Sequence, residues 1–321
     1  MRVALIGAGS WGCAIADLFC QKSHRIYWWV HKPEIAESLR RYGRHPFIFP
    51  EHTFPENYIE ILSCELEEVL LPAEAVVLAL PSRYVIPVLE AHTLPDVPWI
   101  SCTKGLLSES GLRPSLYFRQ RHLTHFAVLS GPSHAEEVIQ RRPTWVGLGT
   151  SEKEMYEIAR TLFETSFFRL LYTPAINSLE WVGTLKNIYA IGIGALSSLG
   201  DNARAAVAAV MLAELQEVLA AWVPQETTPF LSPAWAGDFL VTAFSNHSRN
   251  QRFGEYLAQG YTPQTALARL GMTAEGYYAA QALKDRVDPT FPILYTIIQV
   301  LTGSAPSTLL REKIIKALGE K

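Results

Sequence analysis

The N-terminus combines an apolar run with a regular spacing of glycines. Residues 3–19 read VALIGAGSWGCAIADLF: a strand pattern, the motif Gly7-x-Gly9-x-x-Gly12, and then a helical pattern. Gly7 permits a tight turn, Gly9 lets a pyrophosphate approach the backbone, and Gly12 lets helix and strand pack closely. The free N–H groups at the start of the helix favour an anion. The motif therefore predicts a dinucleotide site, and a glycine-rich turn that binds nothing is the alternative.

Short β-rich runs recur through the first half of the chain. Runs this apolar indicate strands covered on both faces, and helical spacers lie between several of them. The runs cover residues 3–6, 25–30, 75–80, 99–102, 126–130, 144–149 and 167–172. They predict an α/β, Rossmann-like domain with a mainly parallel sheet.

After residue 172 the pattern changes to long Ala- and Leu-rich stretches with helical spacing. Pro174 interrupts both patterns, so the boundary is placed between Thr173 and Asn177. We predict a dinucleotide-binding domain over residues 1–175 and an all-helical substrate and catalytic domain over residues 176–321.

The charge balance limits the classes of partner. The 321 residues include 28 Lys and Arg against 31 Asp and Glu, a formal net charge of −3. Such a chain lacks the concentrated positive surface that nucleic acids and anionic membranes require. Its four cysteines lack metal-binding spacing, the N-terminus turns to glycine too soon for a secretory signal, and no apolar run reaches ~18 residues. We expect a cytoplasmic protein with no metal, no nucleic-acid partner and no membrane span.

The second β-rich run ends at His31 and Lys32, where an NAD-specific site usually carries an acidic residue. Glu34 is the nearest acid. Basic residues here tolerate a 2′-phosphate, which favours the use of NADPH. The alternative is that both side chains only cover the edge of the adenine.

Polar residues follow three of the predicted strands. They are Pro81–Ser82, Thr103–Gly105 and Ser130–Ser133, and they offer hydroxyls, glycines and Lys104. In an open parallel sheet, ligands bind beyond the carboxyl ends of the strands. Ordinary turn chemistry explains each segment alone. Their shared position favours a small substrate that is rich in oxygen or phosphorylated.

The helical half holds a polar cluster and an isolated lysine. Arg249 offers a planar fork suited to phosphate, and Ser248 and Asn250 add neutral donors, with a solvated loop as the alternative. Lys186 lies in an apolar helical run with no carboxylate three or four residues away. Either its stem reaches out to water, or its ammonium lies in a cleft where the proton can be exchanged.

Eight segments, taken in order, resemble the bacterial-type NAD(P)-dependent glycerol-3-phosphate dehydrogenases. They are GAGSWG, TKGL, LSGPSHAEEV, LKNIYAIGIG, LGDNARAA, GDFLVT, SRNQRFG and AEGY, and they span nearly the whole chain. The resemblance implies interconversion of sn-glycerol 3-phosphate and dihydroxyacetone phosphate by hydride transfer with NAD or NADP. It also implies supply of glycerol 3-phosphate for phospholipid synthesis, and a homodimer.

The resemblance further implies roles for single residues. Lys186 matches the catalytic lysine, a general acid/base that exchanges the hydroxyl proton. The other implied catalytic residues are Lys104, Asp238 and Thr242. The implied substrate contacts are Lys104, Gly131, Ser133, Lys186, Asn187, Asp238, Ser248, Arg249 and Asn250. The implied cofactor contacts are Gly7, Gly9, Ser10, Trp11, Gly12, His31, Lys32, Lys104, Ala135, Arg249, Thr273 and Glu275.

The chain also departs from the family pattern. The segment before Asp238 reads SPAWAGD, and Val210 and Met211 stand where the family usually has an Arg-Gly pair. These changes bear on catalytic rate and loop geometry. Two other functions are considered: a reductase of the 3-hydroxyacid or ketopantoate type, which leaves SRNQRFG unexplained, and a nucleotide sensor that has lost turnover.

Overall fold

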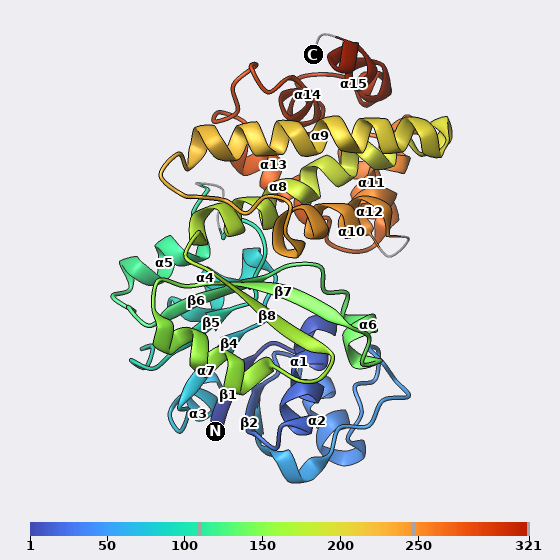
Figure 1. The fold of residues 1–321 in the computed structure, drawn as a ribbon. Helices are drawn as coiled ribbons and strands as arrows, with labels where there is room; N and C mark the ends of the chain where they lie inside the picture. The colour runs from blue at the N-terminus through green and yellow to red at the C-terminus, as the bar shows by residue number, and fades with distance from the viewer. Residues whose placement is uncertain (108–110, 246–247, 320–321) are drawn as a thin grey trace. The chain divides into compact units, whose positions relative to one another are not determined.

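The computed structural model describes residues 1–107, 111–245 and 248–319 (Figure 1). The chain divides into two compact units. The first contains residues 1–107 and 114–176, and the second contains the described residues from Asn177 onward together with residues 111–113. Each unit is considered by itself below.

An eight-stranded sheet forms the middle of the first unit, in the order β3-β2-β1-β4-β5-β6-β7-β8 (Figure 1). All neighbouring strands are parallel except β6 and β7, which are antiparallel. The strands are β1 Arg2–Ile6, β2 Arg25–Trp29, β3 Ile59–Ser63, β4 Ala75–Leu78, β5 Trp99–Ser101, β6 Phe126–Ser130, β7 Thr144–Gly149 and β8 Phe168–Thr173. The predicted α/β class with a mainly parallel sheet is confirmed.

The edge strand β3 is absent from the seven runs that the sequence predicts. Its sequence IEILS is only partly buried, and Glu60 interrupts the apolar pattern. The Glu60 carboxylate pairs with Arg25 and accepts a hydrogen bond of 2.9 Å from the Tyr27 hydroxyl, both on β2. Parallel pairing with β2 holds β3, and Ile59 and Leu62 pack against the core. Because Glu60 divides its short apolar run, the strand leaves only a weak hydrophobic signal in the sequence.

Helices flank the sheet, and α1 packs against both α6 and α7 (Figure 1). The helical elements are α1 Ser10–Gln21, α2 Pro33–Tyr42, the 3-10 turn η1 Glu56–Tyr58, α3 Leu66–Leu70, α4 Ser82–Leu89, α5 Pro114–Gln120, α6 Ala135–Ile139 and α7 Lys153–Phe163. The order of the strands reverses between β1 and β4, and ligands of open sheets bind at such a point. Ile6 pairs with both Trp29 and Leu78, so three strands end level there.

The second unit is built from helices. They are α8 Ile176–Ala195, η2 Ser197–Leu199, α9 Asp201–Trp222, the π turn η3 Pro233–Gly237, α10 Asp238–Phe244, α11 Arg249–Ala258, α12 Pro263–Leu270, α13 Glu275–Leu283, α14 Pro292–Leu301, η4 Ser307–Leu309 and α15 Leu310–Gly319. Every residue of α8 from Ser178 to Ala195 is buried, so this helix is the centre of the unit. The predicted helical second half is confirmed.

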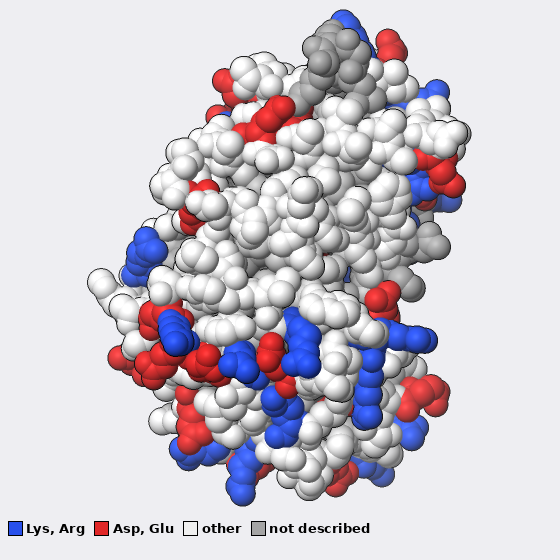
Figure 2. Space-filling model, in the orientation of Figure 1, with Lys and Arg blue, Asp and Glu red and all other residues white. Residues whose placement is uncertain are grey.

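Among the described residues, α9 is the one helix long and apolar enough to cross a membrane, with a mean hydropathy of 1.5 over eighteen residues. Core helices of globular domains have the same character. Glu214 on α9 is fully buried and accepts hydrogen bonds of 3.0 and 2.7 Å from the backbone N–H groups of Ile293 and Leu294, where α14 begins. The exposed side of α9 carries mainly alanines, and Figure 2 shows a largely uncharged face on this unit.

Candidate active site

The glycine-rich loop lies between β1 and α1. Gly7 has a φ of +117°, and a Cβ atom there would lie 2.7 Å from the Ala79 carbonyl oxygen. A Cβ atom at Gly12 would lie 2.2 Å from the Gly7 carbonyl oxygen, so helix and loop require glycine at both positions. A Cβ atom at Gly9 would meet nothing within 4 Å. The loop is therefore tightly packed on its inner side and open beside Gly9, as a backbone that contacts a pyrophosphate must be.

A cavity of about 360 Å³ adjoins this loop. Its lining is mostly apolar and consists of Gly7, Ala8, Gly9, Trp29, Val30, His31, Lys32, Ile35, Leu80, Tyr84 and Val88. His31 and Lys32 are exposed at its rim, and Lys32 is the residue that precedes the first turn of α2. An apolar slot beside glycines and basic side chains fits the adenosine half of NAD or NADP.

The cavity also adds residues that the motifs do not indicate. Ile35, Leu80, Tyr84 and Val88 line it, and the Arg83 guanidinium donates a hydrogen bond of 2.6 Å to the Tyr84 hydroxyl at its edge. Tyr84 lies two residues after Ser82, which the strand-end reasoning already singles out. A search that included the first helical turn after each strand end would have found Tyr84.

Lys104, Gly131 and Ser133 come together on one backbone oxygen. The Gly131 carbonyl accepts hydrogen bonds of 2.8 Å from the Lys104 ammonium and 3.0 Å from the Ser133 hydroxyl. Gly131 has a φ of +154°, and a Cβ atom there would lie 2.8 Å from the backbone of Val146. The loops after β5 and β6 are thus joined through the lysine.

Trp11 lies on α1 and Ala135 on α6, two helices of this unit that pack against each other. Trp11 hydrogen-bonds to the Cys102 thiol, and burial raises the pKa of that thiol to about 12, so it remains protonated. Ala135 is buried at the first position of α6, the helix that packs on α1. Ser10 is the first residue of α1, where free backbone N–H groups begin.

In the second unit, the Lys186 ammonium forms an ion pair with the Asp238 carboxylate. The two side chains are 5% and 0% exposed. The sequence places no carboxylate three or four residues from Lys186, and the structure gives its ammonium a carboxylate 52 residues along the chain, on α10. Burial disfavours both charges, whereas each stabilises the charge of the other, so the pair is held as a unit.

The departure SPAWAGD forms the π turn η3 directly before α10. Ala234, Trp235 and Ala236 are buried in it, and the Trp235 indole N–H donates a hydrogen bond of 3.3 Å to the Ser178 hydroxyl on α8. Single π turns often occur at functional sites. This turn fixes the start of α10, so the altered sequence still delivers Asp238 to Lys186.

Two asparagines link the polar cluster of Ser248, Arg249 and Asn250, the phosphate site predicted from the sequence, to the neighbouring helices. The Asn250 amide donates a hydrogen bond of 3.0 Å to the Asn187 side-chain oxygen and accepts one of 3.1 Å from the Gly276 N–H. Asn187 in turn donates to the Gly183 carbonyl at 3.1 Å. Because these bonds join α8, α11 and the start of α13, Asn187 and Lys186 have fixed orientations.

Glycines bring the same three helices into backbone contact. A Cβ atom at Gly254 would lie 1.9 Å from the Ile191 carbonyl oxygen, and one at Gly276 would lie 2.4 Å from the Asn187 carbonyl oxygen. These are distances that no side chain tolerates. The close approach brings the first turns of α11 and α13 against Asn187, the residue after Lys186 on α8.

The N-terminus of α11 carries Ser248 and Arg249. The buried Ser248 hydroxyl accepts a hydrogen bond of 3.3 Å from the Gln251 N–H as the helix cap, whereas Arg249 is exposed as the first helical residue. The helix dipole and this guanidinium together favour an anion there. Thr273 and Glu275 lie at the start of α13 and are partly buried. The Thr242 hydroxyl donates at 2.8 Å to the Asp238 carbonyl, one turn earlier on α10.

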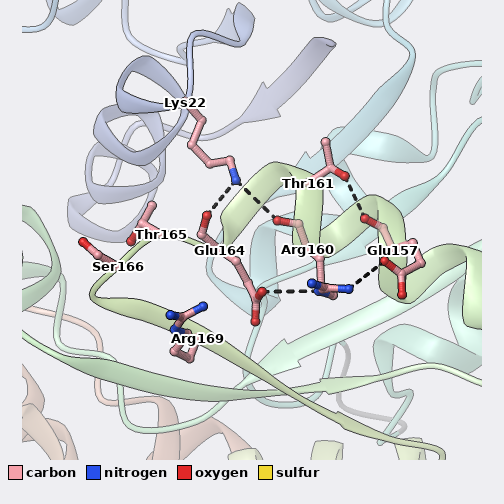
Figure 3. Close-up of a pocket in the computed structure, with 8 residues that line it drawn as sticks. All are labelled: Lys22, Glu157, Arg160, Thr161, Glu164, Thr165, Ser166 and Arg169. Carbon is pink, nitrogen blue, oxygen red and sulfur yellow. Dashed lines mark hydrogen bonds and ion pairs between the residues drawn. The ribbon is translucent and has the colours of Figure 1, made fainter.

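A larger cavity of about 490 Å³ lies elsewhere on the first unit, at the end of α7 (Figure 3). Two of the cations that line it, Lys22 and Arg160, are already engaged. Lys22 donates to the Glu164 carbonyl at 2.6 Å, and Arg160 pairs with the Glu157 and Glu164 carboxylates at 2.9 and 3.3 Å. Such contacts cap a helix end rather than bind a ligand. Among the described residues, no group of three or more His, Cys, Asp or Glu is placed to hold a metal ion.

Two family models match the chain. Residues 2–156 match the N-terminal model of NAD-dependent glycerol-3-phosphate dehydrogenase, and residues 176–310 match the C-terminal model. A glycerol-3-phosphate dehydrogenase (NAD(P)+) from Moorella thermoacetica is 34% identical over 312 residues, which is 95% of this chain and 92% of that protein. One from Chlorobium phaeobacteroides is 32% identical over 319 residues, 95% of both.

A solved structure agrees. The crystal structure of glycerol-3-phosphate dehydrogenase from Coxiella burnetii has a TM-score of 0.85 and 25% identity, and covers 98% of both chains. The chain therefore belongs to the family of NAD-dependent glycerol-3-phosphate dehydrogenases, and it is an oxidoreductase that uses NAD or NADP.

Proposed function

We propose that the chain interconverts sn-glycerol 3-phosphate and dihydroxyacetone phosphate. The observation that carries this proposal is the buried ion pair of Lys186 and Asp238 in a helical unit that matches the C-terminal family model. A buried lysine costs stability unless it has a partner and a use. Here it has both, because the oxidised and reduced substrates differ by one proton at the C2 oxygen as well as by a hydride.

Lys186 is the group that moves this proton. In the direction of reduction, the ammonium donates a proton to the oxygen as the carbonyl becomes a hydroxyl, and in oxidation the amine accepts it back. Asp238 favours the ammonium, and burial favours the amine, so the opposing effects let both forms take part. Asn250 holds the side chain of Asn187, the residue that follows Lys186 on α8. The nicotinamide supplies the hydride.

Arg249 and the N-terminus of α11 bind the phosphate. The exposed guanidinium, the dipole of a helix of ten residues and the nearby amide of Asn250 suit a dianion better than a carboxylate. In the first unit, Lys104 joins the loops after β5 and β6, where substrate oxygens are expected. Binding of the phosphate away from C2 orients the reacting carbon.

Turnover of dihydroxyacetone phosphate tests the proposed function directly. The parent chain with NADPH or NADH is expected to consume dihydroxyacetone phosphate, followed as loss of absorbance of the reduced cofactor. Ketopantoate and 3-oxoacids of similar size serve as controls and are expected to give no turnover, because their carboxylates do not match the phosphate cluster. Turnover of an oxoacid instead would favour the rival reductase function, and tight binding of NADPH without any turnover would favour a sensor.

Replacement of Lys32 by glutamate tests the cofactor preference. Lys32 is exposed beside the cavity at the end of β2, so its charge can reach the 2′-phosphate of NADPH. We expect the KM for NADPH to rise about tenfold and the KM for NADH to change little. The difference should shrink as salt is added, because salt screens an exposed pair. Equal changes for both cofactors would contradict a role in recognition of the 2′-phosphate.

The family resemblance also supports three statements about context, which we propose together. The chain is a cytoplasmic homodimer, and its product glycerol 3-phosphate enters phospholipid synthesis. Light scattering measures the mass of the assembly, and a monomer at micromolar concentration would contradict the dimer.

A further inference from the structure

The second unit holds a buried carboxylate that the proposed mechanism does not use. Glu214 is fully buried on α9, which lies between α8 and α14 (Figure 1). Its Oε1 atom accepts hydrogen bonds of 3.0 Å from the Tyr189 hydroxyl on α8 and 2.7 Å from the Leu294 N–H. Its Oε2 atom accepts one of 3.0 Å from the Ile293 N–H. The carboxylate therefore joins three helices through these donors.

The position of this carboxylate is fixed on two sides. Two of its donors are backbone N–H groups at the start of α14, so they cannot turn away, and the dipole of that helix of ten residues favours a negative charge. One turn before Glu214, the buried Met211 faces α8. A Cβ atom at Gly192 on α8 would lie 2.9 Å from the Met211 Cε atom and 2.7 Å from the Ile297 Cδ1 atom. The missing side chain of Gly192 lets α9 and α14 pack directly on α8.

The Tyr189 hydroxyl links the fixed carboxylate to α8. Tyr189 is fully buried. Burial, and after it the charge of Glu214, raises the pKa of Tyr189 well above its ordinary value, so the hydroxyl stays protonated and donates. A ring whose hydroxyl is bonded to a fixed acceptor cannot move to another rotamer without breaking that bond. Glu214 therefore sets the direction of the Tyr189 ring.

The same ring contacts the helix that carries Asp238. Tyr189 packs edge-on against Phe239, with the ring centroids 6.0 Å apart and an angle of 63° between the rings. Phe239 follows Asp238 in the first turn of α10. Tyr189 lies three residues after Lys186, so both side chains are on the same face of α8. The helices α8 and α10 thus meet twice, through the ion pair and through the two rings.

Proton transfer requires this kind of support. A displacement of about 1 Å from the reactive geometry can lower a rate by about 10²-fold. Lysine has a long side chain with several rotatable bonds, so the direction of the Lys186 ammonium depends on where its partner carboxylate is held. That carboxylate is on the first residue of α10, and the Tyr189 ring packs on the second.

We propose that Glu214 and Tyr189 are positioning residues for the proton transfer. The Glu214 carboxylate fixes the Tyr189 ring, and the ring holds the first turn of α10, which carries Asp238. Asp238 in turn keeps the Lys186 ammonium directed at the substrate oxygen. Glu214 and Tyr189 act only through other side chains and exchange no proton themselves. The inference rests on the proposed function in one respect, that Lys186 moves the substrate proton.

Three variants test these contacts. Tyr189→Phe removes only the hydroxyl, Glu214→Gln keeps the shape of the side chain but turns one acceptor into a donor, and Tyr189→Leu removes the ring. We expect kcat with dihydroxyacetone phosphate to fall about 3- to 10-fold in the first two variants, the effect of one hydrogen bond. Tyr189→Leu should lower it about 10- to 100-fold. The KM for NADPH should stay within about twofold in all three.

A double variant and a solvent isotope effect identify the cause. Tyr189→Phe and Glu214→Gln break the same bond, so together they should lose no more rate than the worse of the two alone. A partly unfolded variant contains less active enzyme, which lowers the apparent kcat but leaves the isotope effect of the folded fraction unchanged. A misplaced Lys186 slows the proton transfer itself. The ratio of kcat in H2O to kcat in D2O should therefore rise above that of the parent.

The unit offers a matched control for each residue. Tyr277 packs edge-on against Phe253 at 5.9 Å, and its hydroxyl makes no hydrogen bond to the described residues, so Tyr277→Phe should keep the parental kcat. The Glu226 carboxylate accepts hydrogen bonds of 3.1 and 2.7 Å from two backbone N–H groups at the start of α8. Glu226→Gln should lower the melting temperature as Glu214→Gln does, and it should keep the isotope effect of the parent.

Three results would overturn the inference. They are a parental kcat in Tyr189→Phe, additive losses in the double variant, and a lowered kcat with an unchanged isotope effect. If Tyr189→Leu does not fold, Tyr189→Phe and the double variant decide. Failure of the proposed function looks different, because the parent itself then does not reduce dihydroxyacetone phosphate, and the inference falls with it.

Discussion

Lys186→Ala is expected to lower kcat by about 10²- to 10⁴-fold, the usual contribution of a general acid/base, while NADPH still binds. Lys186→Arg sharpens the test. Arginine keeps the positive charge beside Asp238 but does not release a proton near neutral pH. If Lys186 moves the substrate proton, both variants lose turnover in stopped-flow and steady-state assays. If it only neutralises Asp238 or polarises the carbonyl, the arginine variant retains much of the rate.

The loss of rate must be separated from unfolding. Removal of one partner from a buried ion pair typically costs about 3–5 kcal/mol, and Lys186→Ala removes this partner from the buried Asp238 carboxylate. The double variant Lys186→Met with Asp238→Leu removes both charges and should recover stability without recovering activity. A thermal melt and NADPH fluorescence show whether each variant is folded. A folded Lys186→Ala that keeps more than a tenth of the parental kcat would exclude the acid/base role.

Local patterns in the sequence were enough to predict the cofactor unit. Gly7 is required by its φ of +117° and Gly12 by the carbonyl of Gly7 five residues earlier, so the spacing is set within one strand, turn and helix and survives in the sequence. The same holds for the strands that are covered on both faces. The edge strand β3 was missed because Glu60 divides its short, half-buried apolar run.

The helical unit shows the other limit of sequence reasoning. Lys186 was identified as unusual because no carboxylate lies three or four residues away on its helix, but its partner Asp238 lies on another helix and follows a π turn. No helical period predicts that turn. The bond from Asn250 to Asn187 likewise depends on the backbone contact at Gly254, which only the packed helices reveal. The family motifs indicate Lys186, Asn187, Asp238 and Asn250 without their contacts. The structure shows that Lys186 pairs with Asp238 and that Asn250 bonds to Asn187.

Arg249→Ala is expected to raise the KM for dihydroxyacetone phosphate by about 10- to 100-fold, with a smaller change in kcat. The guanidinium stands at the first turn of α11, whose cap Ser248 and buried Asn250 remain intact in the variant. The helix dipole and the free N–H groups still attract the phosphate, so binding weakens but is not abolished. Lysine at this position should restore part of the affinity, because it keeps the charge and loses the planar fork.

A substrate that lacks the phosphate shows whether Arg249 acts on the phosphate or on another part of the substrate. The parent should prefer dihydroxyacetone phosphate to dihydroxyacetone strongly in kcat/KM, and Arg249→Ala should reduce that preference while it leaves the rate with dihydroxyacetone nearly unchanged. Arg252→Ala, an exposed arginine on the same helix, is the matched control and should keep the preference. An equal loss with both substrates would place Arg249 near the reacting carbon or the cofactor instead. Because the phosphate is distant from C2, only a true phosphate contact changes one substrate and spares the other.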